Sequence, residues 1–486
     1  MRKNFLTTLA IMFVAFFVAT TVAQAADVTF GGQVLTRYEI NEQHDFDDDT
    51  GADDFTQSRV RLNANVNVND STSAFIQLNS NRRWGNSAGA VAATGANPNG
   101  DGNASFTAND RDASVGITQA YFTLNNFATL PVDLKVGKQQ IIWDGHRLFG
   151  NTIWTMGQQN HDAMRLSHKH DNMSIEYAWI IGAEDGAPTG NNADDRNDVE
   201  VHAVHAGYQG ILGGKLTATY AYIDDGCGSA ITAACNNLED SFHTIGFRQA
   251  GQLFGIDYRG EYFYQWGDAT ATAATASTAK NANANRVATV GTNVDRNAFM
   301  FGARIGKAFN NVAMKPSLTL WYDHLSGTSD NDLDNNNYKS FNTLFDTGHK
   351  FYGLMDNFLG VGTGSSATGT SGLGLQDIAV KAKLSPVANW TLNAHYHWFR
   401  TAEGIAGSPQ AGLNGQNTIQ GVNYGNAEPN NNLGNELDLT LVNKYNANTN
   451  IVFGFSNYTT TSAYRDLRNV VGDGANWAYL QFDVKF

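Results

Sequence analysis

The chain has 486 residues, of which 42% are hydrophobic and 16% are charged, and its formal net charge is −14. These values do not separate a soluble fold from a membrane β-barrel. Beyond the N-terminal segment, no stretch approaches the roughly 18 uninterrupted apolar residues that a spanning helix needs, which excludes a helical membrane protein.

The N-terminal segment is typical of a cleavable signal peptide. MRKNFLTTLAIMFVAFFVATTVAQA begins with two basic residues, continues with an apolar stretch over 9–19, and ends in the small-x-small pattern Ala23-Gln24-Ala25. The alternative, a retained membrane anchor, would need a longer apolar core. We therefore predict a signal peptide over residues 1–25 and an exported single-domain barrel over 26–486.

The segment QSRVRLNANVNVND, residues 57–70, alternates apolar side chains from Val60 to Val68 with arginines and asparagines. A period of two predicts a strand with one apolar face. In a soluble sandwich that face points inward, whereas in a membrane barrel it points outward to lipid. Alternation alone does not choose between them.

The lengths of the connections between strands distinguish a membrane barrel from a soluble sandwich. About 18 strands are predicted, at residues 27–41, 57–69, 72–84, 113–126, 132–142, 161–170, 172–182, 198–209, 213–224, 240–250, 252–266, 295–309, 313–325, 373–385, 389–402, 433–446, 449–460 and 475–486. Tight turns such as Ala250-Gly251 and Asn310-Asn311 alternate with long connections. Short turns on one rim and long loops on the other predict an all-β, antiparallel, up-and-down outer-membrane barrel, with its short turns periplasmic and its long loops extracellular.

Two further features agree with a bilayer. Trp390 and Trp398 bracket an apolar row about 27 Å long along its strand, or about 20 Å of membrane depth after tilting. The last strand, WAYLQFDVKF, carries an apolar face to Phe486, so closure against the first strand leaves no free edge. A terminal Phe resembles the signal that the barrel-assembly machinery recognises, so that machinery is an expected partner.

Charges on the inward faces carry the functional prediction. The predicted pore-lining, anion-attracting residues are Arg37, Arg59, Arg61, Arg83, Arg259, Arg304, Lys381 and Lys383. The first three strands bring four arginines against roughly one acid, and guanidinium forks bind carboxylate, sulfate or phosphate. The alternative is that most inward charges form ion pairs that stiffen the wall.

Metal and cofactor signals are weak. His395 and His397 are two residues apart on one predicted strand, about 7 Å from one another, and the sequence identifies no third ligand. The acidic segments 44–55 and 330–337 lack the Gly and Glu positions of a calcium-binding EF-hand loop and are typical of a solvated rim in contact with lipopolysaccharide. We expect no metal and no cofactor.

The remaining reactive groups do not predict an enzyme. Cys227 and Cys235 enclose seven residues in CGSAITAAC, a spacing unlike the CxxC of a redox or zinc site, and a local loop disulfide is favoured over two free thiols. Ser167 and His168 alternate to opposite faces, which excludes a direct catalytic dyad between them.

Four segments, VGKQQIIWDGHRLFGNTIW, FDTGHKFYGLMDNF, GNELDLTLVNKY and the C-terminal WAYLQFDVKF, resemble the alginate export family of outer-membrane barrels. The resemblance implies export of an anionic polysaccharide, yet the long periplasmic turn expected of the alginate-secreting member is absent. Our main hypothesis is a passive outer-membrane channel for small polar solutes, anionic or saccharide, in a Gram-negative bacterium. The alternatives are polysaccharide export and a structural barrel in a surface complex. The expected partners are membrane lipid, lipopolysaccharide and the solute, and no nucleic acid.

Overall fold

The structure is a computed structural model. It describes residues 27–42, 46, 51–84, 115–183, 199–225, 240–272, 291–329, 332, 335–361, 369–370, 372–405, 418–419, 422–423, 430–468 and 470–486. The predicted signal peptide and the cysteines at 227 and 235 fall outside these residues and remain predictions. Among the described helices, none combines the length and the apolar character needed to cross a membrane.

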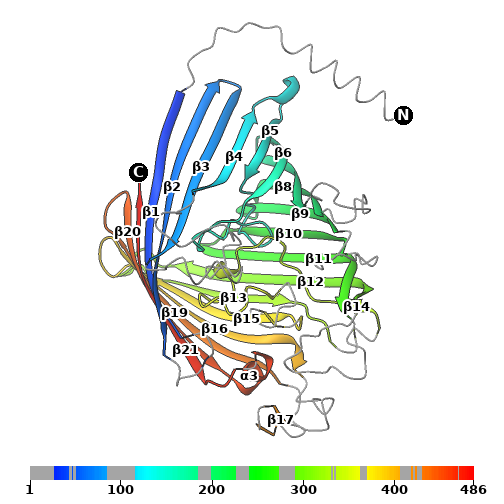
Figure 1. The fold of residues 1–486 in the computed structure, drawn as a ribbon, viewed down its shortest axis with the longest axis vertical. Helices are drawn as coiled ribbons and strands as arrows, with labels where there is room; N and C mark the ends of the chain where they lie inside the picture. The colour runs from blue at the N-terminus through cyan, green and yellow to red at the C-terminus, as the bar shows by residue number, and fades with distance from the viewer. Residues whose placement is uncertain are drawn as a thin grey trace.

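Long antiparallel strands form the wall (Figure 1). They are β1 (Asp27–Asn41), β2 (Asp53–Asn69), β3 (Thr72–Arg83), β4 (Gly116–Leu124), β5 (Asp133–Gln139), β6 (His161–His170), β7 (Met173–Ala183), β8 (Val199–Ile211), β9 (Gly214–Asp225), β10 (Phe242–Leu253), β11 (Ile256–Thr272), β12 (Gly291–Ala308), β13 (Ser317–Leu325), β15 (Leu375–Leu384), β16 (Trp390–Ile405), β19 (Asn430–Lys444), β20 (Thr449–Thr460) and β21 (Gly474–Lys485). Each overlaps one of the predicted strands, so the 18-stranded barrel is confirmed.

The described loops add short elements. These are the one-turn segments η1 (Phe127–Thr129) and η2 (Gly348–Lys350), the helix α3 (Ser462–Arg468), β14 (Asn337–Tyr338), and the pair β17 (Thr418–Ile419) and β18 (Val422–Asn423). Strand β14 adds a parallel bridge to β12 at the long-loop rim.

The barrel closes between its first and last strands. β1 pairs with β21 in the register Val34 to Val484, and the ladder ends with two bonds between Gly32 and Phe486, N–H to O distances of 2.7 and 3.1 Å. The Phe486 ring covers Gly32, where a Cβ would lie 2.6 Å from the ring. The C-terminal strand therefore pairs with the first strand and has no free edge.

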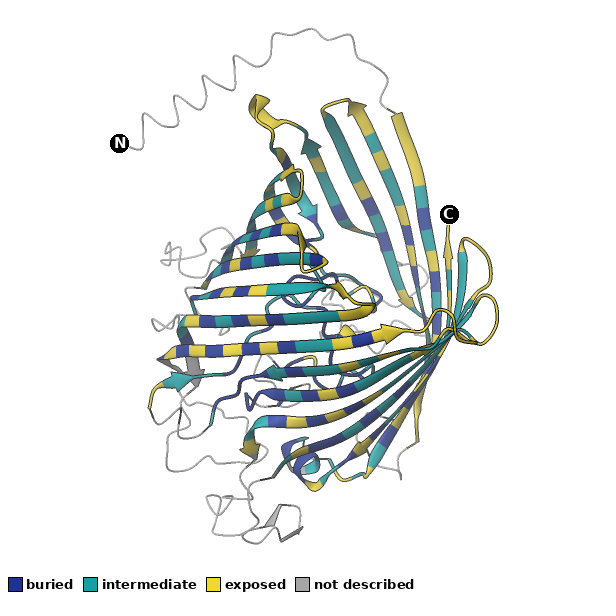
Figure 2. Cartoon of the chain, turned by 180° about the vertical axis from the view of Figure 1, so that it is seen from behind, coloured by how far each residue is buried: buried dark blue, intermediate teal, exposed yellow. Residues whose placement is uncertain are grey.

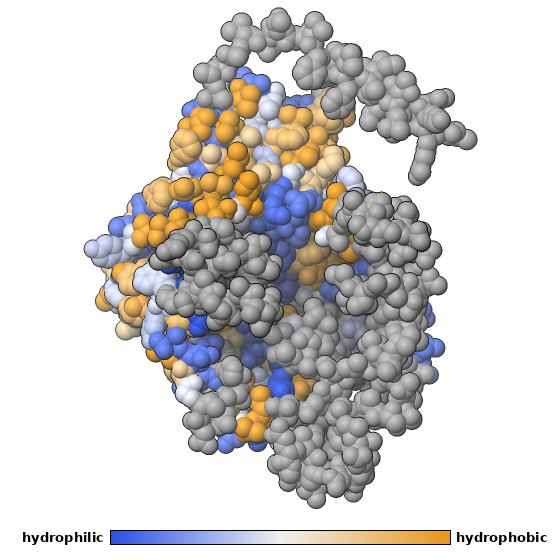
Figure 3. Space-filling view, in the orientation of Figure 1, coloured by the Kyte–Doolittle hydropathy of each residue, from blue (hydrophilic) through white to orange (hydrophobic). Residues whose placement is uncertain are grey.

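The two faces of the wall are chemically opposite. Val60 and Leu62 on β2 are 40% and 51% exposed, whereas the alternating Arg59 and Arg61 are 2% and 4% exposed. Alternating buried and exposed bands follow most strands (Figure 2), and apolar surface gathers over the upper wall in the space-filling view (Figure 3). Apolar side chains face outward and polar ones inward, as a lipid-embedded barrel requires.

Two predicted turns are wrong in detail. β10 and β11 continue pairing to Leu253 and Ile256, so the turn lies at Phe254-Gly255, both with positive φ, rather than at Ala250-Gly251. This is the conformation that matches the twist of a two-residue hairpin. The β12–β13 connection is also longer than the predicted Asn310-Asn311 turn and spans residues 309–316. It is closed by a hydrogen bond from Phe309 N–H to Pro316 O, 2.8 Å long.

Candidate functional site: inner loops and a cationic cavity

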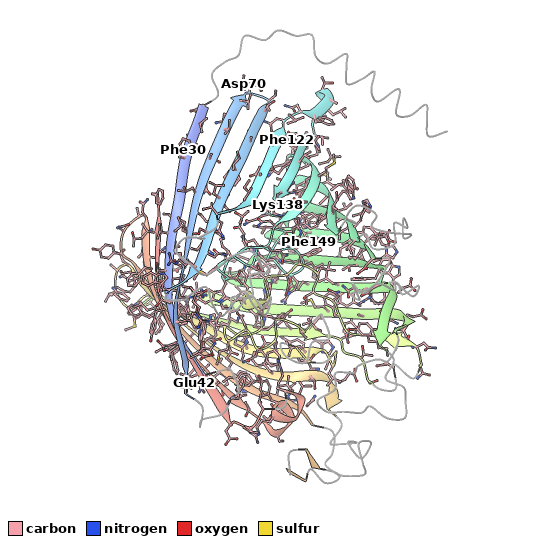
Figure 4. The ribbon with its side chains drawn as sticks, in the orientation of Figure 1. Phe30, Glu42, Asp70, Phe122, Lys138 and Phe149 are labelled. Atoms are coloured by element: carbon pink, nitrogen blue, oxygen red, sulfur yellow. The ribbon has the colours of Figure 1, made fainter. Side chains whose placement is uncertain are left out.

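Two long connections fold into the barrel: residues 140–160, the first inner loop, and the described residues between 326 and 374 (326–329, 332, 335–361, 369–370 and 372–374), the second inner loop. Phe149 lies within the ring of strands, while Glu42 and Asp70 mark opposite ends of the wall (Figure 4). Phe149 and Phe345 form a parallel β-bridge between the loops. Gly150 N–H donates to Phe345 O at 2.7 Å, and Phe345 N–H donates to Leu148 O at 2.8 Å. The two loops therefore form one body in the lumen.

Three of the predicted arginines hold the first inner loop. Arg37 donates to Trp154 O at 3.1 Å and stacks over the Trp154 ring. Arg59 donates to the carbonyls of Ile153 and Thr155 at 3.0 and 2.9 Å. A carbonyl is a good acceptor for guanidinium but carries no charge, so these bonds fasten the loop. The charge of Arg37 is paired with Glu39, whose Oε1 lies 2.7 Å from Arg37 Nε.

Arg61 completes this row by donating to Gly157 O at 3.1 Å. The row faces inward, and the loop covers each side chain, so that Arg37, Arg59 and Arg61 are 3%, 2% and 4% exposed. Arg83 lies elsewhere, at the long-loop end of β3, with its guanidinium 4.3 Å from the centre of the Phe55 ring.

Arg147 is the anchor that the sequence did not reveal. It lies in the first inner loop and is buried between two wall carboxylates, with Nη2 2.6 Å from Asp323 Oδ2 and 3.0 Å from Glu261 Oε1. Its Nη1 donates to the Tyr352 hydroxyl of the second inner loop at 3.0 Å. The alternation of a strand does not extend to a loop residue, so the sequence could not predict which way the Arg147 side chain points.

The second inner loop is also anchored on strands β16 and β19. Met355 N–H donates to Glu436 Oε1 at 2.8 Å, and Gly353, at φ 85°, leaves no room for a Cβ beside that carboxylate. Phe358 of this loop packs against wall ring Phe399 at 4.6 Å between centroids. Apolar packing thus fills this side of the lumen.

A cavity of about 360 Å³ remains between the inner loops and the short-turn end of the barrel. Its charged lining consists of Arg248, Arg259, Arg304, Lys350 and Asp257. Within the lining, four positive groups outnumber one acid. Arg248 is also paired with Asp144 and Glu261, at 3.9 and 3.8 Å. Desolvation, with Arg259 and Arg248 nearby, lowers the pKa of Lys350, the member contributed by the second inner loop.

Trp321 of β13 lines the cavity, and three cationic side chains lie around its ring. The Arg304 guanidinium carbon lies 2.9 Å, and Lys381 Nζ 4.1 Å, from the centre of its ring. Arg259 approaches it at 5.2 Å. The structure therefore brings together three of the predicted lining residues, and Lys383 lies apart, exposed near the short-turn end of β15.

Some of these donors lack protein acceptors. Among the described residues, Arg259 Nη2 and Arg304 Nη2 make no hydrogen bond, although Arg304 Nη2 lies 3.6 Å from Asp323. Arg147 hydrogen-bonds both Glu261 and Asp323, and Glu261 also lies 3.8 Å from Arg304 Nη2 and from Arg248 Nε. The cavity thus presents guanidinium groups that an anionic solute can satisfy.

Comparisons with solved structures give the same barrel. The chain aligns with OccAB1 of Acinetobacter baumannii at 12% identity and a TM-score of 0.54, covering 96% of this chain and 98% of that one. OccAB4 of the same organism aligns at 12% identity and a TM-score of 0.53, covering 96% and 100%. OccK2 (OpdF) of Pseudomonas aeruginosa, solved in complex with glucuronate, aligns at 10% identity and a TM-score of 0.52, covering 96% and 99%.

A search of curated proteins found no match. The alginate export family model matches residues 26–476, nearly the whole chain. This match confirms the resemblance found in the sequence, and together with the closed barrel and its apolar outer face it places the protein in the outer membrane. The chain belongs to the alginate export family.

Proposed function

We propose that this protein is a passive outer-membrane channel for small anionic solutes, carboxylated saccharides among them. The observation that carries the proposal is the cavity of about 360 Å³ lined by Arg248, Arg259, Arg304 and Lys350. Its volume falls at the small end of the range for small-molecule sites, about 300–1,000 Å³. Fixed positive charge beside a narrowed lumen raises the local anion concentration and disfavours cations.

Division of labour among the arginines follows from their contacts. Arg259 and Arg304 act on the solute, whereas Arg37, Arg59 and Arg61 position the first inner loop. OccK2 was solved with glucuronate, a sugar that carries one carboxylate. A solute of that class offers the acceptor that a guanidinium fork binds in bidentate fashion and hydroxyls for the polar wall.

The test is the reversal potential of single channels across a KCl gradient. We expect anion selectivity in the wild type and a clear shift toward zero in the double variant Arg259→Gln and Lys350→Gln. The control is Lys138→Gln. Lys138 forms an exposed ion pair with Asp162, 3.4 Å away, and lies on the face of β5 opposite to that of the buried Gln139. This change therefore also removes one positive charge, but on the outer face of the wall. Cation selectivity in the wild type, or no shift in the double variant, contradicts the proposal.

The family also supports a second candidate, export of an anionic polysaccharide. Adding glucuronate and alginate oligomers separately distinguishes the two, since a small-solute channel is blocked briefly by both, whereas an exporter passes the longer chain. A structural barrel gives no conductance steps at all. We further propose that the apolar outer face contacts lipid and that lipopolysaccharide contacts the outer rim.

A further inference from the structure

We propose that the barrel wall holds a site for a first-row divalent transition cation of the Zn²⁺ type, formed by His395 and His397 of β16 and Asp438 of β19. One nitrogen or oxygen from each side chain lies within 4.8 Å of the corresponding atoms of the other two. The sequence shows only the two histidines, which lie on one strand. The third ligand comes from the neighbouring strand, where Asp438 is paired in register with His395.

The hydrogen bonds leave the ligand atoms free. His397 Nδ1 contacts both oxygens of Asp377 at 2.9 Å, which favours the Nδ1–H tautomer and leaves the Nε2 lone pair for a metal. Asp438 Oδ1 accepts from Ser456 Oγ at 2.6 Å. Within the described residues, His397 Nε2 and Asp438 Oδ2 are buried without a hydrogen-bond partner.

These two atoms face each other at 3.9 Å. That separation is too long for a hydrogen bond, yet an ion bound at about 2.0–2.1 Å from each atom spans it. The three ligand atoms all lie within 4.8 Å of one another, and any pair more than about 4.2 Å apart requires one ligand to move, since each metal–ligand bond is about 2.0–2.1 Å long. His395 is half-buried, whereas His397 and Asp438 are 0% and 1% exposed, so His395 is the side chain free to close.

The surrounding charges favour a cation. Glu436 lies two residues from Asp438 on the same face of β19, is also fully buried, and has one oxygen without a partner in the described structure. Asp377 adds a third carboxylate. Lys381, paired in register with His395, opposes a metal, but its Nζ lies 4.1 Å from the centre of the Trp321 ring. Three buried carboxyl groups thus face one lysine, and binding of a divalent cation favours their ionised form.

The ligand set indicates the class of metal. Two imidazole nitrogens and one carboxylate oxygen suit Zn²⁺, Ni²⁺, Cu²⁺ or Fe²⁺ rather than Ca²⁺ or Mg²⁺, which take oxygen ligands. Asp377 acts here as a positioning residue that orients His397. The half-buried His395 gives an ion a route from the lumen.

The experiment uses the full-length mature barrel, refolded in detergent without a histidine tag and stripped with a chelator. We expect dialysis against Zn²⁺ to leave about one Zn per chain, and Co²⁺ to give visible absorption bands of a nitrogen- and oxygen-ligated ion. His395→Gln and Asp438→Asn remove the bands and the stoichiometric metal. Asp377→Asn weakens Zn²⁺ binding about 10- to 100-fold, the usual effect of losing a metal-orienting partner.

His243→Gln is the matched control, since His243 lies on β10 between the rings of Tyr222 and Trp266 and should leave binding unchanged. A difference in gel migration between heated and unheated samples verifies that each variant is folded. A wild-type barrel that retains no metal and shows no Co²⁺ bands overturns the site whatever the variants do. Undiminished binding in folded His395→Gln also overturns it, and that change is the mildest because the side chain is half-buried.

Discussion

Replacing Arg147 with Met should release the inner loops from the wall. Met keeps a stem like that of Arg but lacks the guanidinium, which in Arg147 connects Asp323, Glu261 and Tyr352 at distances of 2.6 to 3.0 Å. Removing one partner of a buried ion pair costs about 3–5 kcal/mol. We take the lower end, because Arg304 Nη2 still lies 3.6 Å from Asp323 and 3.8 Å from Glu261.

About 3 kcal/mol corresponds to a roughly hundredfold increase in the population with the loop detached. In planar bilayers the variant should show larger conductance steps or frequent transitions to a larger open level, together with faster proteolysis of residues 140–160. The Lys138→Met variant, which removes the exposed pair with Asp162, should behave as the wild type. Conductance, current noise and proteolysis that all match the wild type would refute the assignment of Arg147 as the anchor.

Three other predictions concern packing and pH. Gly150→Ala places a methyl group against Thr347 Oγ1 and 3.0 Å from the Thr347 nitrogen, so the inner loops should separate and single-channel conductance should rise; unchanged conductance contradicts the tight contact. Gly32→Ala brings a Cβ 2.6 Å from the Phe486 ring and 2.7 Å from Arg61 O. It should lower the free energy of unfolding, measured in urea, by about 1–3 kcal/mol. Gly260 has open space around it, so Gly260→Ala should cause no such loss, and equal losses in the two variants would contradict the closure geometry. Burial raises the pKa of Asp346 in the second inner loop from 3.8 to about 7, so loop packing is most stable below about pH 4 and weakens as pH rises toward 7. Current noise should therefore increase from pH 4 to 7 in the wild type and stay flat in Asp346→Asn, and parallel pH profiles would count against this group.

The sequence was sufficient for the wall because a strand that borders lipid and water has only two environments. Strict alternation around Val60 and Arg61 fixes which side chains share a face, and the sorting of short turns from long loops fixes which face meets lipid. The β10–β11 turn was misplaced because Arg248 to Leu253 lacks clear alternation, and only the register with β11 shows that pairing continues to Ile256.

The lumen depended on contacts that periodicity does not encode. Arg59 and Arg61 were correctly placed inside, yet their carbonyl partners come from residues about a hundred positions later in the first inner loop. Arg147 was missed for the same reason, since a loop residue has no face until the loop folds. Family motifs within both inner loops identified the segments but not what they contact.

The sequence by itself determined the barrel, its orientation toward lipid, its closure through Phe486 and its family, because these follow from local alternation and loop length. Only the tertiary structure decided that two extracellular loops fill the lumen, that a cationic cavity lies beneath them, and that Asp438 joins His395 and His397. The physical reason is that hydrogen bonds and ion pairs act over a few ångströms in space, and residues distant in the chain come within that range only when the barrel has closed around them.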